Sequence, residues 1–222
     1  MAAVLNTAAL LIDSSTRHLL VGRVSKAGTA LRCTETSAAG ENAIDLAVAD
    51  LFPDLAEISE ICLGEGPGSF VGLRSAFAYT RMFAMLRAIP CRTFHSSRLW
   101  HLLLGVPQDE WLLMRTNAKL YYAERFVPGR ESAAVDIADA GNLTGKIYCY
   151  SGSWLAKNPQ AENNEIPAHW QKTDFAPEKI PGFQVNSALL RLSEVKPHDS
   201  LTPIYGHELH FKLAKGFNGQ TN

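Results

Sequence analysis

The chain has 222 residues, of which 46% are hydrophobic, and its formal net charge is -1. This length can bury a sizeable core, arranged as one large domain or as two small domains packed together. The charge balance provides no basic field for nucleic acid, so we expect any contact with RNA to be indirect.

The first six residues, MAAVLN, lack the basic residues of a signal peptide, and no apolar run approaches membrane-spanning length. The four cysteines contain no C-x-x-C pair, which fits free thiols in a reducing cytosol better than a disulfide framework. We therefore expect a cytoplasmic protein with no membrane contact.

The first predicted elements form an antiparallel meander. Turn-forming residues separate short apolar runs, which is the pattern of neighbouring strands joined by tight turns. The strands are predicted at residues 8–12, 19–21 and 30–36.

A helix is predicted over residues 40–52, where Pro53 stops the pattern. Its apolar residues recur at the spacing of a single helical face. These residues are Ile44, Ala47, Val48 and Leu51.

A strand, a helix and a second strand are predicted next, at residues 57–64, 70–86 and 89–94. This order implies a parallel crossover, so the first half should be a mixed sheet with helices on it. A further helix is predicted over residues 96–105.

The second half has a weaker pattern. We predict a hairpin over residues 110–127, a strand within 145–154 and a short helix over 186–195, with Asn186 as its cap. Residues 158–181 are polar and contain prolines, which favours a loop.

The glycine-rich turn before the 70–86 helix is the first candidate site. Its glycines fit neither G-x-x-x-x-G-K-[ST] nor G-x-G-x-x-G, and Ser69 does not fit G-x-S-x-G. We interpret it as a structural strand-to-helix turn in which Ser69 caps the helix. This structural loop consists of Gly66, Pro67, Gly68, Ser69 and Gly72.

The 70–86 helix is apolar on almost its whole circumference. One side carries Leu73, Ala76, Phe77, Phe83 and Ala84, and the other carries Val71, Ala78, Met82, Met85 and Leu86. Such a helix either lies at the centre of one domain or packs one side on a sheet and the other on a second protein. The pattern does not choose between these arrangements.

The segment GEGPGSFVGLR, residues 64–74, resembles the G-x-GPGSFTGLR segment of the TsaB (YeaZ) family. The opening LLIDSST is similar to the family's LaIDTSt, and LYYAERF and YSGSW resemble later family segments. The resemblance is strong over residues 10–97 and patchy beyond them.

The resemblance implies an α/β fold of the actin-like (ribonuclease H-like) type, with mixed sheets and helices in two small related subdomains. We expect an N-terminal subdomain with the partner-binding helices over residues 1–105 and a more divergent one over 106–222. The last residues should either pack back on the first subdomain or be disordered.

The resemblance also implies a function. TsaB is the non-catalytic scaffold and activator that dimerises with TsaD in the bacterial synthesis of N6-threonylcarbamoyladenosine (t6A37) in tRNAs reading ANN codons. TsaD carries the metal and performs the transfer, and the ATPase TsaE joins the pair. We therefore expect no catalytic residue, cofactor or metal in this chain, and a homodimer when the chain is alone.

In the family, the helices matching 40–52 and 70–86 contact the partner. The candidate partner-binding residues are Ile44, Ala47, Val48, Leu51, Leu73, Arg74, Phe77, Ala78, Arg81, Met82 and Met85. The chain departs from the family pattern at residues 40–42, 71, 75–76 and 114–116, which suggests a divergent member with its own partner surface.

Asp13 and Ser15 mark a candidate vestigial nucleotide cleft, because actin-like ATPases place a metal-facing carboxylate at this turn. The alternative is a turn aspartate whose side chain bonds its own backbone. An active phosphotransferase or ATPase of the actin-like superfamily is the competing function, although no phosphate-binding lysine and no second carboxylate support it.

A metallopeptidase is a further alternative. His95 and His101 are six residues apart, a spacing that a helix would splay, and His207 and His210 lack a third ligand beyond Glu208. The four tryptophans lack interleaved basic residues, so we interpret them as core or interface residues rather than base-stacking platforms.

Overall fold

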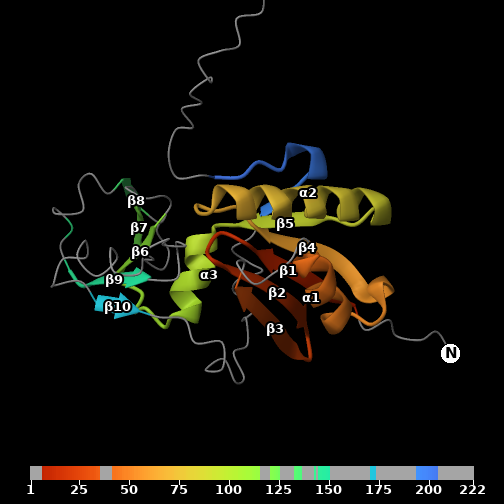
Figure 1. Cartoon of the computed structure of the whole chain (residues 1–222), viewed down its shortest axis with the longest axis horizontal. Coiled ribbons are helices and arrows are strands. Elements are labelled where there is room, and N and C mark those ends of the chain that lie inside the picture. Colours follow the sequence, from red (N-terminus) through yellow and green to blue (C-terminus); the bar gives the residue numbers. More distant parts are fainter. Residues whose placement is uncertain are drawn as a thin grey trace, which may run out of the picture.

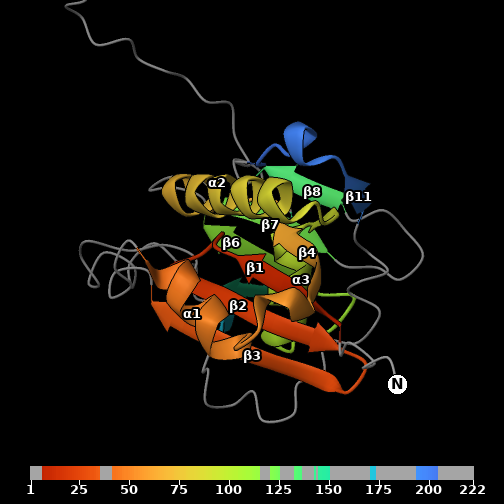
Figure 2. The ribbon, with the colours of Figure 1, turned by 90° about the vertical axis from the view of Figure 1, so that its right-hand side faces the viewer.

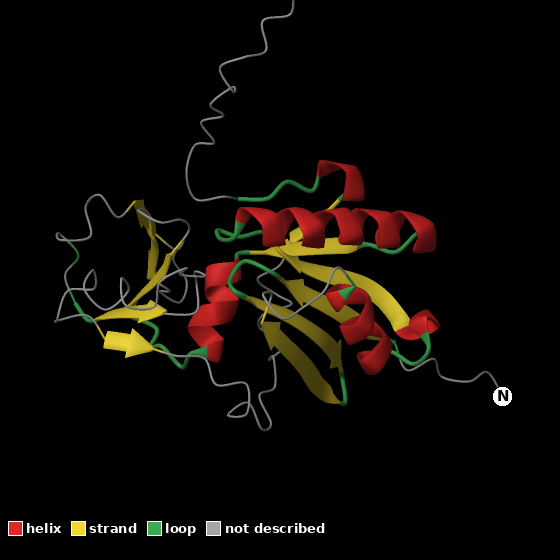
Figure 3. Cartoon of the chain, viewed as in Figure 1, coloured by secondary structure: helices red, strands yellow, loops and turns green. Residues whose placement is uncertain are grey.

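Two β-sheets and three α-helices make up the described part of this computed structural model (Figure 1; Figure 3). The structure describes residues 7–35, 42–115, 121–125, 133–136, 143, 145–150, 171–173 and 194–204. Some residues with predicted roles lie outside these ranges, namely residues 40–41, Asn186, His207 and His210. Within the described residues, no helix combines the length and apolar character needed to cross a membrane.

The first sheet has six strands in the order β11-β5-β4-β1-β2-β3. Its antiparallel meander consists of β1 (Ala8–Asp13), β2 (His18–Ser25) and β3 (Gly28–Glu35). Strand β4 (Ile58–Gly64) pairs in parallel with both β1 and β5 (Cys91–Phe94). The predicted meander and the predicted parallel crossover are confirmed.

Helices cover both faces of this sheet (Figure 2). Helices α1 (Ala43–Leu51) and α2 (Phe70–Arg87) pack on one face, and α3 (Ser96–Leu103) packs on the other. Because side chains alternate along a strand, Leu10 and Ile12 of β1 reach the first core, while Leu11 reaches the second. Strands buried on both faces explain the continuous apolar run at residues 8–12.

The ends of α2 follow from local chemistry. The Ser69 side-chain oxygen accepts a hydrogen bond from the Gly72 backbone N–H at 3.3 Å, so the predicted cap is confirmed. At the other end, Ala88 has a left-handed backbone with φ 51, and its N–H donates to the Ala84 carbonyl.

The second sheet has five strands in the order β10-β9-β6-β7-β8. The predicted hairpin is confirmed, because β6 (Trp111–Arg115) and β7 (Tyr121–Arg125) pair antiparallel. The other strands are β8 (Ala133–Asp136), β9 (Ile147–Tyr150) and β10 (Gln171–Thr173). The loop prediction for 158–181 is wrong at β10, a short edge strand that depends on parallel pairing with the distant β9.

A segment from the C-terminal part of the chain, residues 194–204, returns to the first sheet and runs over α2 (Figure 1). We call it the returning segment. It begins with β11 (Glu194–Lys196), which pairs antiparallel with β5, and continues through the short 3-10 helix η5 (His198–Ser200). The prediction of a helix over residues 186–195 is therefore wrong at Glu194 and Val195, because pairing with the edge of the sheet overrides the local helical propensity. The proposed boundary between residues 105 and 106 stays a prediction.

The returning segment is anchored to the first sheet by polar and apolar contacts. The Lys196 ammonium donates to the buried Glu65 carboxylate at 2.7 Å, and the Ile204 N–H donates to the Glu65 carbonyl at 2.6 Å. Leu201 is fully buried in the α1–α2 core. The wall that the segment forms beside α2 is therefore a fixed part of the fold.

Candidate functional site

The turn after β1 holds the carboxylate singled out in the sequence. Asp13 is fully buried, and its Oδ1 accepts hydrogen bonds from the Ser15 hydroxyl at 2.7 Å, the Ser15 N–H at 3.2 Å and the Trp100 indole N–H at 3.0 Å. Among the described residues, its Oδ2 has no hydrogen-bond partner. The carboxylate thus bonds the backbone of its own turn, as in the alternative interpretation of Asp13, and in addition accepts from a tryptophan of α3.

The glycine-rich loop packs directly on this turn. The Ser69 N–H donates to the Ser15 carbonyl at 2.6 Å, so one of the free donors at the start of α2 is already used. A Cβ on Gly68 would clash with the Ser15 carbonyl, and one on Gly72 would clash with the Ser14 carbonyl. The glycines are needed because two backbone segments touch here, and the loop fills the space over the Asp13–Ser15 turn.

Aromatic side chains fill the space between this turn and the second sheet. Trp100 stacks on Tyr150 of β9 with ring centroids 5.0 Å apart, and both rings are buried. The Tyr150 hydroxyl lies 2.7 Å from Nδ1 of His18 on β2. Burial raises the pKa of Tyr150, so its hydroxyl stays protonated and can donate to the imidazole. These contacts join the two sheets through a polar and aromatic cluster.

Two buried histidines give the fold a predictable pH dependence. Burial lowers the pKa of His18, with a further contribution from Arg17, and burial also lowers the pKa of His101. The unfolded chain, with histidine pKa values near 6.5, therefore binds protons first as the pH falls. Their contribution to the free energy of unfolding should be complete above about pH 6.5 and decrease as the pH falls towards the folded-state pKa values. Urea denaturation at pH 7.5 and pH 5.5 measures this decrease in the free energy of unfolding. The decrease should be smaller for the variant H18Q/H101Q. If that variant showed the same pH dependence as the wild type, the two histidines would not be its source.

The α2 helix separates its apolar residues into a buried side and an exposed side. The buried side is Leu73, Ala76, Phe77, Thr80 and Ala84. On the opposite side, the exposed fraction is 73% for Val71, 52% for Met82, 62% for Met85 and 73% for Leu86. The helix α2 therefore does not lie at the centre of a domain. It packs one side on the sheet and leaves the other side exposed in the single chain.

The predicted partner-binding residues divide accordingly. Val48, Leu51, Leu73 and Phe77 lie in the α1–α2 core and are at most 6% exposed. Ile44 and Ala47 are half-buried against the same core. The exposed members are Arg74, Ala78, Arg81, Met82 and Met85. Their contact with a partner protein stays a prediction.

Three exposed side chains were missing from the candidate residues. Val71 and Leu86 lie on the open side of α2, and Leu46, on α1, is 71% exposed. The sequence pattern already groups the first two with Ala78, Met82 and Met85 on one side of the helix, at intervals of three, four and seven residues. We call Val71, Ser75, Ala78, Met82, Met85 and Leu86 the α2 ridge.

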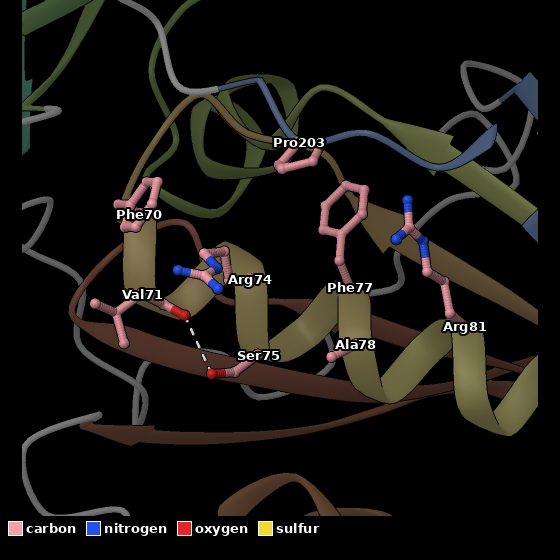
Figure 4. Close-up of a pocket in the computed structure, with 8 residues that line it drawn as sticks. All are labelled: Phe70, Val71, Arg74, Ser75, Phe77, Ala78, Arg81 and Pro203. Atoms are coloured by element: carbon pink, nitrogen blue, oxygen red, sulfur yellow. Dashed lines mark hydrogen bonds between the residues drawn. The ribbon is translucent and has the colours of Figure 1, made fainter. Parts of the chain in front are cut away.

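A groove of about 550 Å³ runs beside the α2 ridge, between α2 and the returning segment (Figure 4). Its walls include Phe70, Phe77 and Pro203, and two arginines, Arg74 and Arg81, project from α2 on the same side. The Arg74 guanidinium lies 5.3 Å from the centroid of the Phe70 ring. Arg81 donates a hydrogen bond to the Leu201 carbonyl.

The histidines considered as metal ligands do not meet in the described structure. His95 lies 3.7 Å from the Glu65 carboxylate, and His101 contacts the Glu110 carbonyl instead. Residues 7–35, 42–115 and the shorter described segments contain no group of three histidine, cysteine or acidic side chains suited to a metal ion. His207 and His210 lie outside these residues.

No protein-family model matches this chain, and no curated protein matches it. Solved structures do share its fold. YeaZ from Pseudomonas aeruginosa is 15% identical and superposes with a TM-score of 0.61, covering 90% of this chain and 99% of that chain. An uncharacterized protein with similarity to peptidase YEAZ from Pseudomonas aeruginosa gives 15% identity and a TM-score of 0.60, covering 90% of this chain and 100% of that one. The predicted α/β fold is confirmed as that of the YeaZ structures.

Proposed function

We propose that this chain is a divergent TsaB (YeaZ) family member, and that it serves as the non-catalytic partner subunit of a TsaD-family enzyme that makes t6A37 in tRNA. The observation that carries the proposal is the α2 ridge, an exposed apolar helix face on a YeaZ-like fold. The family resemblance of residues 64–74 supports the proposal, since the matching helix of the family contacts the partner.

The α2 ridge has the features of a helix-pairing surface. Four of the eight large hydrophobic side chains that are exposed among the described residues lie on it, at 52–73% exposure. The small residues Ser75 and Ala78 lie between Val71 and Met82, so a facing helix can approach closely. Methionine and aromatic residues are enriched in interface cores, and scattered apolar residues would not align along one helix in this way.

A homodimer of the isolated chain would use the same face. An antiparallel pairing of two α2 helices centred on Ala78 would place Val71 of one copy opposite Met85 of the other. It would also bring Ala78 against Ala78 at the crossing point, where a small side chain is needed. Such an interface is isologous and closed, so we expect a dimer rather than larger assemblies.

The surroundings of Asp13 support a non-catalytic role. A phosphotransferase of this fold would need a carboxylate open to a metal and space for phosphates. Here the Asp13 Oδ1 is engaged by Ser15 and Trp100, and the glycine-rich loop packs on the same turn. The alternative function, an ATPase, would require this loop and the Trp100 ring to move away.

Co-purification with the TsaD-family protein of the same cell tests the proposal. The purified chain should form a one-to-one complex with that protein, and calorimetry with ATP and magnesium should show no turnover by the chain alone. Absence of a complex under these conditions, or ATP turnover by the isolated chain, would overturn the proposed function.

A further inference from the structure

The groove beside the α2 ridge is cationic. Arg74 and Arg81 project into it from α2, and the whole helix, residues 70–87, contains no aspartate or glutamate. The two arginines are seven positions apart in the sequence, so their Cα atoms are about 10 Å apart along the helix axis. The groove therefore presents two positive charges two helical turns apart, with an apolar wall between them.

Neither arginine is neutralised within the described part of the chain. No described acidic side chain forms a salt bridge with Arg74 or Arg81. The Arg74 guanidinium lies over the Phe70 ring, which fixes the position of a flexible side chain. Arg81 uses one N–H on the Leu201 carbonyl, and a guanidinium has five such donors. Both side chains thus keep donors for an external acceptor.

We propose that this groove receives a helix of the partner subunit carrying two carboxylates two turns apart, one for each arginine. The inference rests on the proposed function, because it adds a chemical requirement to the partner that meets the α2 ridge. Arginine and carboxylate form paired hydrogen bonds in one plane, which fixes register as well as adding affinity. The rings of Phe70 and Phe77, together with Pro203, form the wall against which the aliphatic part of those acidic side chains packs.

The partner's binding element is a helix because of the shape of the surface. The groove follows α2 from Phe70 to Arg81, a length of about three turns. The α2 ridge borders it on the outer side, with the small residues Ser75 and Ala78 in its middle. A helix lying along this ridge would place residues seven apart against Arg74 and Arg81.

The charge pattern favours such a partner over a second copy of this chain. In the antiparallel homodimer, the facing α2 supplies no carboxylate, and Arg74 lies opposite Met82. Both arginines of each copy would then be partly desolvated without a counter-charge, which costs free energy. The arginines therefore weaken self-association relative to pairing with an acidic helix and give the ridge its partner specificity.

A charge reversal tests this inference. The variant R74E/R81E should raise the Kd for the TsaD-family subunit at least about 30-fold, since like charges would face each other. The control K26E/K146E changes the net charge equally at two exposed lysines far from α2 in the sequence, and should bind within about twofold of the wild type. Circular dichroism and the urea midpoint verify that each variant is folded. A neutral variant, R74Q/R81Q, should bind about fivefold more weakly and lose most of the salt dependence.

The outcomes separate the inference from the proposed function. If R74E/R81E and R74Q/R81Q bind as the control does, while the wild type forms the complex, the acidic-helix inference is wrong and the proposed function stands. If the charge-reversed variant does not fold, the neutral variant decides in the same way. If the wild type forms no complex, the proposed function fails and the inference falls with it.

Discussion

The double substitution M82E/M85E should abolish pairing with the proposed TsaD-family partner and leave the fold intact. Both side chains lie on the α2 ridge, 52% and 62% exposed, and neither belongs to a core cluster. In a complex, the two carboxylates would be buried against an apolar surface without a counter-charge. We expect the Kd to rise at least about 100-fold, because an unpaired buried charge costs several kcal/mol. Titration calorimetry with the purified subunit measures this change.

The matched control for this prediction is V195E. Val195 is 60% exposed on β11, so the control places a carboxylate on an exposed apolar residue of the same domain but outside the ridge. Both variants should unfold within about 0.5 kcal/mol of the wild type, as surface substitutions do. Wild-type affinity in a folded M82E/M85E protein would show that the α2 ridge is not the interface.

The variant W100A should cause the largest loss of stability. Trp100 is fully buried, stacks on Tyr150, and donates its indole N–H to the Asp13 carboxylate. Its removal leaves a cavity where α3 meets the second sheet and takes one hydrogen bond from a buried carboxylate. We expect a loss of about 3–5 kcal/mol, a large share of the total stability of a small domain. Urea denaturation followed by circular dichroism measures it.

Two comparisons identify the source of that loss. W100F keeps an aromatic ring against Tyr150 but removes the hydrogen bond to Asp13, so it should lose less than W100A. L102A is a control on the same helix, because Leu102 is 37% exposed. If W100A were no less stable than L102A, Trp100 would not connect the Asp13 turn to the second sheet.

Local patterns predicted the first half of the fold well. Apolar runs broken by turn residues at 13–16 and 26–29 placed the meander, and the pattern from Ile58 to Phe94 placed the parallel crossover. Ser69 as the cap of α2 followed from residue type and position alone. These features depend on neighbours in the sequence, and the sequence is therefore sufficient to find them.

Contacts between distant residues could not be predicted in this way. Strands β10 and β11 are three residues long and exist only because β9 and β5 offer edges for pairing. Trp100 reaches Asp13 across 87 residues, so the sequence could not show that an α3 side chain engages that carboxylate. A helix apolar on almost its whole circumference does not reveal which side the sheet covers. For this reason Leu73 and Phe77 were grouped with Met82 and Met85 as partner-binding candidates.

The most direct test of the proposed function is t6A37 formation in a reconstituted reaction. The TsaD-family and TsaE-family proteins of the same cell, tRNA reading ANN codons and an activated threonylcarbamoyl donor are combined with and without this chain. We predict that modified tRNA forms only when the wild-type chain is present, and that M82E/M85E gives no more product than its omission. Equal product with and without the chain would contradict the account.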